Sequence, residues 1–190
     1  MEETKAFSKD RYIADDVLKL KNKFNINIAI ETGTLGGETT EWLSKNFEKV
    51  FTVEYNSNNY NNCLEKLKNI SNIKLNLGDS VIFIKDIVKK HSNDMCLFYL
   101  DAHGTLPTPT PHELYQIVEM KIKPCIVIHD FYVPGKNFNY DTYTDFDYKI
   151  ENIKNILDLI YGVNGYVYFY NTQTDPIGYN VGCIFITPKK

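Results

Sequence analysis

The most constraining feature of this 190-residue chain is a regular alternation of two kinds of segment. Short apolar runs typical of buried strands alternate with runs whose apolar residues recur at helical spacing. Five strand-like runs come first, at Ile26–Thr32, Val50–Tyr55, Ile73–Gly78, Met95–Asp101 and Pro124–Asp130. Because a helical run follows each of the first four, the pattern predicts an α/β fold with a doubly wound, Rossmann-like sheet that is mostly parallel.

The two ends of the chain complete this pattern. A helix is predicted at Asp10–Phe24, within an N-terminal helical segment 1–24. The last two strand-like runs, Gly165–Asn171 and Val181–Pro188, have no helix between them and should pair antiparallel, which makes seven strands. The length suits one domain with its own core, so a single domain 1–190 is expected.

Composition excludes several classes of protein. A hydrophobic content of 43% is that of an ordinary globular chain, and a net charge of -3 gives no general attraction to nucleic acid or anionic membranes. No apolar run approaches the roughly 20 residues of a membrane span, and the first residues lack an apolar signal core. We therefore expect a cytoplasmic protein without nucleic-acid or membrane partners. Its four cysteines form no CxxC pair and are expected to be buried free thiols: Cys63, Cys96, Cys125 and Cys183.

Acidic or glycine-rich turns follow every one of the first five strands. Contact with solvent explains one or two acids at such positions, but explains five in succession poorly. Ligands of doubly wound sheets bind at the carboxyl ends of the strands. The acids at these ends are Glu31, Glu54, Asp79, Asp101 and Asp130.

The turn after the first strand carries Gly33, Gly36 and Gly37, directly behind Glu31. A phosphate-binding P-loop would need a lysine here, and a dinucleotide fingerprint would have its first glycine at the position of Glu31. An acid at this turn repels pyrophosphate and suits a positively charged ligand. Glu54 could bind both hydroxyls of a ribose, and Asp79 and Ser80 an adenine. A cationic ligand with a ribose and an adenine, but no phosphate, describes S-adenosylmethionine.

Four stretches, "ETGTLGGETT", "VEYN", "LGDS" and "YLDAHG", occur in this order, and with the closing hairpin they give the chain its resemblance to class I S-adenosylmethionine-dependent methyltransferases. The resemblance covers nearly the whole chain. In that family the glycine turn approaches the methionine part of the cofactor, the second-strand acid binds the ribose and the acid after the third strand lies near the adenine. The cofactor-binding residues that it implies are Glu31, Gly33, Thr34, Gly37, Thr39, Glu54, Asp79, Ser80 and Asp101.

A second group of side chains ends the fourth and fifth strands. Asp101 and the pair His129-Asp130 should converge there, and two carboxylates with an imidazole can hold Mg²⁺, Mn²⁺ or another divalent ion. The alternative is a structural role, with His129 capping a strand and Asp130 binding loop amides. "LDAHG" and "IVIHDF" resemble the metal-dependent O-methyltransferases, in particular the macrolide-sugar and cephalosporin-hydroxylase-like subset. Catechol-type members have Asp-Asn where this chain has His-Asp, so a ligand role for His129 stays open.

Such a site suits methyl transfer to oxygen. A divalent ion lowers the pKa of a hydroxyl and directs it towards the methyl group, while a nearby base takes the proton. His103 is the candidate base and Asp101 its catalytic neighbour; a loop histidine bonded to backbone is the alternative reading of His103.

The segment 131–148 contains seven aromatic residues and three aspartates, which suits contact with a sugar or another ring. We therefore expect a metal-assisted O-methyltransferase that acts on a sugar, a glycan or another small molecule. Three alternatives are a metal-independent methyltransferase, a non-catalytic S-adenosylmethionine-binding module and, disfavoured by Glu31, a nicotinamide enzyme. The acceptor is not identified by the sequence, and a homodimer whose second subunit completes the acceptor pocket stays open.

Overall fold

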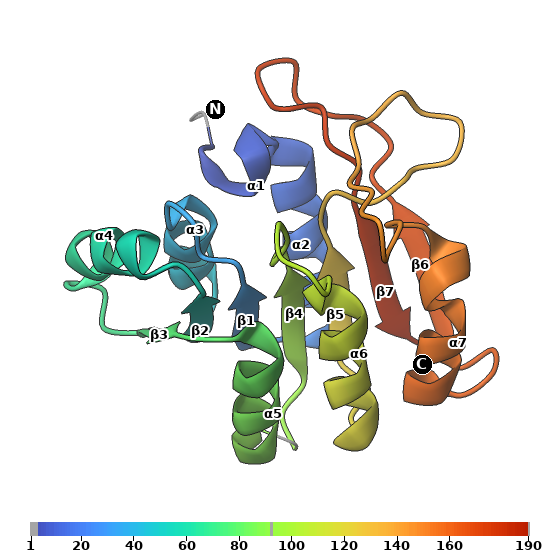
Figure 1. The fold of residues 1–190 in the computed structure, drawn as a ribbon, viewed down its shortest axis with the longest axis horizontal. Helices are drawn as coiled ribbons and strands as arrows, with labels where there is room; N and C mark the ends of the chain where they lie inside the picture. Colours follow the sequence, from blue (N-terminus) through green and yellow to red (C-terminus); the bar gives the residue numbers. More distant parts are fainter. Residues whose placement is uncertain (1–3, 92, 190) are drawn as a thin grey trace.

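Seven strands form one sheet at the centre of the computed structural model, which describes residues 4–91 and 93–189 (Figure 1). The strand order is β3-β2-β1-β4-β5-β7-β6. β1 to β5 are parallel, and β7 runs antiparallel to both β5 and β6. The predicted fold class, including the antiparallel closing pair, is confirmed. The strands are β1 (Ile28–Thr32), β2 (Lys49–Glu54), β3 (Ile73–Leu77), β4 (Cys96–Leu100), β5 (Cys125–Ile128), β6 (Tyr166–Tyr170) and β7 (Ile184–Pro188).

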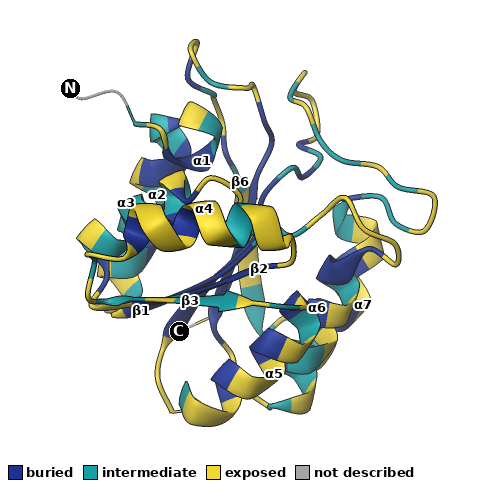
Figure 2. Ribbon diagram, turned by 60° about the vertical axis from the view of Figure 1, so that its left-hand side comes forward, coloured by how far each residue is buried: buried dark blue, intermediate teal, exposed yellow. Residues whose placement is uncertain are grey.

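Helices cover both faces of the sheet, so the apolar cores lie between the layers (Figures 1 and 2). α5, α6 and α7 pack on one face, while α1, α2 and α3 pack on the other. The helices are α1 (Ala6–Lys9), α2 (Arg11–Phe24), α3 (Glu38–Asn46), α4 (Ser57–Leu67), α5 (Ser80–His91), α6 (Pro109–Glu119) and α7 (Ile150–Tyr161).

Successive residues of the central strands enter opposite cores. In β1, Ile28 and Ile30 face the α5–α7 layer, whereas Ala29 faces the α1–α3 layer. Strands buried on both faces are apolar at nearly every position, which is why they appear in the sequence as apolar runs; in β1 only the last two residues, Glu31 and Thr32, are polar. All four cysteines are buried in this interior, as predicted. None of the described helices is long and apolar enough to cross a membrane.

The N-terminal segment differs from the helix expected over 1–24. The long helix α2 begins only at Arg11, where the side chain of Asp10 accepts hydrogen bonds from Tyr12 N and Ile13 N. Before it, Phe7, Ser8 and Lys9 all have positive φ angles, a conformation that costs about 1–2 kcal/mol per residue. Residues 1–3 lie outside the described part of the chain. The helix predicted at Asp10–Phe24 is therefore present as α2, and only the wider helical segment 1–24 is corrected: the residues just before α2 form a left-handed turn.

Burial of Phe7 compensates for this strained turn. Its side chain is 1% exposed, and its ring packs edge-on against Trp42 and Tyr99 at centroid distances of 4.9 and 5.2 Å. Its backbone N–H donates to Thr39 Oγ1. The turn is thus fastened to α3 and to the centre of the sheet.

A buried carboxyl group lies in the α5–α7 layer, on the other face of the sheet from Phe7. Glu113 of α6 is fully buried, and burial raises its pKa to about 7, although the nearby hydroxyls of Ser80 and Thr32 partly offset this. Neither of its carboxyl oxygens has a hydrogen bond of normal geometry in the described part of the chain. An ionised Glu113 therefore destabilises the folded state relative to the protonated form.

The substitution Phe7→Ala should lower the free energy of unfolding by about 3 kcal/mol, because it removes the ring that anchors a strained turn. Urea unfolding followed by circular dichroism measures the change. Leu159→Ala, at an exposed position, serves as the control and should change stability by less than about 0.5 kcal/mol. A loss below about 1 kcal/mol for Phe7→Ala would contradict the anchoring role.

The substitution Glu113→Gln should stabilise the protein increasingly as the pH rises. The pKa of Glu113 is about 7 when folded and close to 4.5 when unfolded, so the wild type loses stability between these pH values as the group ionises. The stability difference between variant and wild type should grow by on the order of 2 kcal/mol from about pH 5 to about pH 7.5. Urea unfolding at each pH measures it, with exposed Glu65→Gln as the control; a pH-independent difference would refute the assignment.

Candidate functional site

The glycine turn after β1 brings the backbones of β1 and β4 into contact. Gly33 has φ +83°, and a Cβ added there would lie 2.5 Å from the carbonyl oxygen of Asp101. Any side chain at this position would push the two strand ends apart. Gly37, with φ +74°, forms the N-cap of α3. The chain's own backbone thus accounts for the glycine at position 33, whatever ligand binds beside it.

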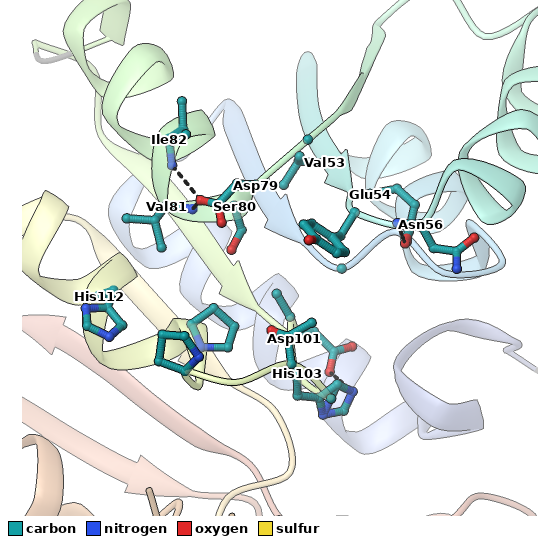
Figure 3. A pocket seen from close by; sticks show the side chains of 18 of the residues that line it. Val53, Glu54, Asn56, Asp79, Ser80, Val81, Ile82, Asp101, His103 and His112 are labelled. Carbon is teal, nitrogen blue, oxygen red and sulfur yellow. Dashed lines mark hydrogen bonds and ion pairs between the residues drawn. The ribbon is translucent and has the colours of Figure 1, made fainter. Parts of the chain in front are cut away.

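A cavity of about 730 Å³ opens beside this turn, at the carboxyl ends of β1, β2 and β4 (Figure 3). This is within the roughly 300–1,000 Å³ range of small-molecule sites. It lies at the point where the strand order reverses, between β1 and β4, which is where doubly wound sheets bind ligands. Figure 3 shows Glu54, Asp79, Asp101 and His103 arranged around one hollow, with His112 of α6 across from them.

The predicted site residues divide into two groups with respect to this cavity. Those that line it are Gly33, Glu54, Asp79, Ser80, Asp101 and His103. Six others are not among its lining residues: Glu31, Thr34, Gly37, Thr39, His129 and Asp130. Thr34 shares a hydrogen bond with Thr52, and Thr39 accepts one from Phe7 N, so both hydroxyls are engaged within the protein. The structure brings Glu54, Asp79 and Asp101 together as expected, but places these two threonines behind the wall.

Glu31 lies buried behind the turn. Its Oε2 accepts hydrogen bonds from the hydroxyls of Thr40 and Thr52, whereas its Oε1 has no partner in the described part of the chain. Burial raises the pKa of Glu31 to about 8; the two threonines oppose this shift, and the neighbouring Asp101 and Glu54 add to it. A positively charged ligand close by would stabilise its ionised form.

Glu54 and Asp79 are held in fixed orientations by backbone amides. The carboxylate of Glu54 accepts from Leu35 N at 2.7 Å and Asn56 N at 2.8 Å, which ties the β2 end to the glycine turn. Asp79 accepts from Val81 N and Ile82 N and so caps α5. A carboxylate has about four acceptor positions, so each can bind a ligand hydroxyl or amine in addition.

A second polar centre adjoins the cavity at the ends of β4 and β5. His129 Nδ1 lies 3.3 Å from Asp101 Oδ1 and 3.0 Å from Asp130 Oδ2, and the potential ligand atoms of these three residues lie within 4.8 Å of one another. His103, Asp130 and Asp141 form an overlapping group with the same spacing. The convergence predicted for Asp101, His129 and Asp130 is therefore present, and two carboxylate oxygens with an imidazole nitrogen fit a divalent ion.

The electrostatics of this centre favour a cation. Burial alone lowers the pKa of His129, but Asp101 and Asp130 outweigh it and hold the pKa well above its ordinary value. Asp130 is shifted the other way: its burial raises the pKa, while His129 and His103 bring the net pKa below its usual value. The pair of carboxylates thus attracts a positive charge, which a proton on His129 or a metal ion can supply.

No residue of the segment 131–148 lines the cavity. Instead, this segment forms hydrogen bonds to residues 101–110, most of which do line it. Four contacts join the segment to 101–110, which runs from the end of β4 into the first turn of α6. They pair Asp141 with His103 Nδ1 at 2.8 Å, Tyr143 with Gly104 N, Asp145 with both N and Oγ1 of Thr108, and Tyr148 with Thr110. We call this set the loop brace.

Sequence reasoning missed the loop brace and part of the cavity wall. The three aspartates and the aromatic residues of 131–148 suggest a binding loop, but nothing in their spacing indicates partners about 40 residues earlier. His112 stands at a helix start, where capping is enough to explain it, yet it lines the cavity together with Tyr115 and Gln116 of the same helix. Their i, i+3 and i+4 spacing on α6 is the one signal that could have placed them on a common face.

No protein-family model matches the sequence, and a comparison with characterised proteins finds no match either. Solved structures do share the fold. An O-methyltransferase from Bacillus cereus in complex with S-adenosylhomocysteine superimposes with a TM-score of 0.65 at 15% identity, covering 93% of this chain and 80% of that one. The O-methyltransferase TomG from Streptomyces achromogenes, in complex with S-adenosylmethionine, gives 0.64 at 12% identity, covering 94% and 80%.

A precorrin 8W decarboxylase from Methanobacterium thermoautotrophicum also matches, with a TM-score of 0.57 at 14% identity, over 92% of this chain and 90% of that one. Likeness at such identities establishes the architecture and leaves the reaction open. The resemblance seen in the sequence is confirmed at this level: the chain has the fold of the class I S-adenosylmethionine-dependent methyltransferases.

Proposed function

We propose that this protein is an S-adenosylmethionine-dependent O-methyltransferase that acts, with the help of a divalent ion, on a hydroxyl of a sugar, a glycan or another small molecule. The observation that carries the proposal is the adjacency of two sites. A cavity with fixed carboxylates for a nucleoside directly adjoins a His/Asp centre that can activate a hydroxyl, and Asp101 belongs to both.

The donor would lie across the ends of β1, β2 and β4. Glu54 would accept hydrogen bonds from the ribose hydroxyls, and Asp79 with Ser80 would face the adenine. The methionine part would then lie over Gly33, close to Asp101 and in front of Glu31. This order follows the cavity wall and places the positively charged end of the donor among carboxylates.

The acceptor hydroxyl would approach from the side of Asp101, His129 and Asp130. A divalent ion held by these three residues would supply Lewis-acid activation of the hydroxyl. The acceptor oxygen forms a bond to the methyl carbon as the carbon–sulfur bond breaks, and the hydroxyl proton must leave. His103 is the proposed base. The carboxylate of Asp141 can only accept a hydrogen bond, so in a neutral ring Nδ1 carries the proton and donates to it. The free lone pair is then on Nε2, which lies 3.9 Å from Asp101 Oδ1.

The acceptor class rests on the surroundings of this centre. Segment 131–148, which follows Asp130 directly in the chain, contains seven aromatic residues, among them the edge-on pair Tyr132 and Tyr140 with ring centroids 5.0 Å apart. Rings with polar edges suit sugars and other hydroxylated rings. A protein that only binds S-adenosylmethionine is the second candidate, and turnover separates the two.

Glu54→Gln should weaken S-adenosylhomocysteine binding about tenfold or more, because hydrogen bonds to a charged group contribute about 1.5–3 kcal/mol. Isothermal titration calorimetry measures the affinity, with NAD as a comparison ligand that should not bind. Glu65→Gln is the matched control, since the Glu65 carboxylate is exposed and pairs with the exposed Lys68. Unchanged affinity in Glu54→Gln, at an unchanged melting temperature, would remove Glu54 from the site.

Turnover should depend on a divalent ion. We expect formation of S-adenosylhomocysteine with at least one probe from a panel of monosaccharide glycosides and catechol, falling about tenfold or more in EDTA and recovering with Mg²⁺ or Mn²⁺. Chromatographic quantification of S-adenosylhomocysteine measures it. Activity that survives chelation would indicate a metal-independent methyltransferase, and donor binding without turnover on any probe would favour the binding module.

A further inference from the structure

We infer that the centre formed by Asp101, His129 and Asp130 selects a first-row transition-metal ion, such as Mn²⁺ or Co²⁺, over Mg²⁺. The inference rests on the proposed function only in taking this centre as the ion site. It concerns which ion the protein's own residues prefer, and it depends on the imidazole of His129.

The position of His129 makes its ring a fixed part of the centre. Its side chain is 2% exposed, and the residue follows directly on β5. Tyr99 of the neighbouring strand packs against the ring at a centroid distance of 5.9 Å. With Nδ1 between Asp101 and Asp130, the ring occupies one side of the space between the two carboxylates. An ion held by both carboxylates would therefore have a nitrogen neighbour.

The donor set separates candidate ions. Mg²⁺ prefers oxygen ligands in octahedral geometry and keeps several of its waters. Imidazole suits the later first-row ions, and affinity for mixed nitrogen and oxygen sites rises from Mn²⁺ towards Co²⁺ and beyond. A site with two carboxylates and one imidazole should therefore bind Mn²⁺ or Co²⁺ with little loss of affinity. Its affinity for Mg²⁺ should be lower, because the buried ring takes the place of a water ligand that Mg²⁺ prefers.

The other ring nitrogen of His129 agrees with this assignment. Nε2 is buried and has no hydrogen-bond partner in the described part of the chain. A ring that binds an ion through Nδ1 carries its single proton on Nε2. The hydroxyl of Tyr99 is also buried without a described partner, and it is a candidate to accept a hydrogen bond from this N–H through a bridging water.

The competing explanation is a charged His129 that forms ion pairs with Asp101 and Asp130 and leaves no room for a metal ion. It predicts that no divalent ion binds with a nitrogen ligand. The two explanations therefore differ in the ligand atoms of a bound ion, and not merely in activity.

The experiment uses the full chain after dialysis against a chelator. Calorimetric titration with Mg²⁺, Mn²⁺ and Co²⁺ should give at least about tenfold tighter binding of Mn²⁺ and Co²⁺ than of Mg²⁺. Pulsed electron paramagnetic resonance on the Mn²⁺-loaded protein should show modulation from a directly bound nitrogen. Both measurements are made on the wild type, so they decide the question even if a variant does not fold.

His129→Asn supplies the matched substitution, because an amide keeps an oxygen donor at the position. It should weaken Mn²⁺ and Co²⁺ binding at least about tenfold, abolish the nitrogen modulation and change Mg²⁺ affinity far less. His91→Asn is the control: His91 lies at the end of α5, pairs with Asp94 and should leave all three affinities unchanged.

Equal binding of Mg²⁺ and Mn²⁺, or absence of a nitrogen signal, would overturn the inference. So would His129→Asn weakening all three ions equally. S-adenosylhomocysteine titration of the same samples separates the two proposals. If S-adenosylhomocysteine binds but no divalent ion does, the inference is overturned and the donor site stands. If the protein selects Mn²⁺ and Co²⁺ but does not bind S-adenosylhomocysteine, the inference is supported and the proposed function is overturned.

Discussion

The approach of Gly33 to the carbonyl oxygen of Asp101 is the contact on which the site depends. β1 and β4 are parallel neighbours at the reversal of the strand order. Because position 33 has no Cβ, the two backbones approach closely and Asp101 lies beside the glycine turn, on the wall of the cavity that Glu54 at the β2 end also lines. The same contact fixes the backbone of Asp101, the residue that belongs both to the cavity wall and to the centre formed with His129 and Asp130.

The fold could be predicted from the sequence because burial leaves a local pattern in the strands. Parts of the structure that depend on contacts between distant residues could not be predicted in this way. Strands buried on both faces are mostly apolar, so β1, β4 and β5 are visible as apolar runs, and the acids at or just after their ends indicate the edge where ligands bind. The left-handed turn at Phe7–Lys9 escaped prediction because its stabilisation comes from contacts with Trp42 and Tyr99, which are distant in the sequence. Local propensity contains no information about such contacts.

The loop brace illustrates the same limit on the functional side. Asp145 binds Thr108, and Asp141 binds His103, across separations of 37 and 38 residues. An aspartate in a polar loop has no local signature that distinguishes a solvated group from one that holds a distant wall in place. The sequence could assign an acceptor-side role to 131–148, whereas the structure adds that this loop holds the segment 101–110, which walls the cavity.

The charge distribution relates the two centres to the proposed chemistry. Burial raises the pKa of Glu31 to about 8 and the nearby Asp101 and Glu54 add to this shift, so a positive charge beside Glu31 would favour its ionised form. S-adenosylmethionine carries a sulfonium, whereas its product S-adenosylhomocysteine does not. An edge lined with carboxylates therefore attracts the donor more strongly than the product, since the attraction to the sulfonium disappears once the methyl group has left. Under the proposed function, the acids that orient S-adenosylmethionine would therefore bind S-adenosylhomocysteine less tightly, which would favour release of this product after each methyl transfer.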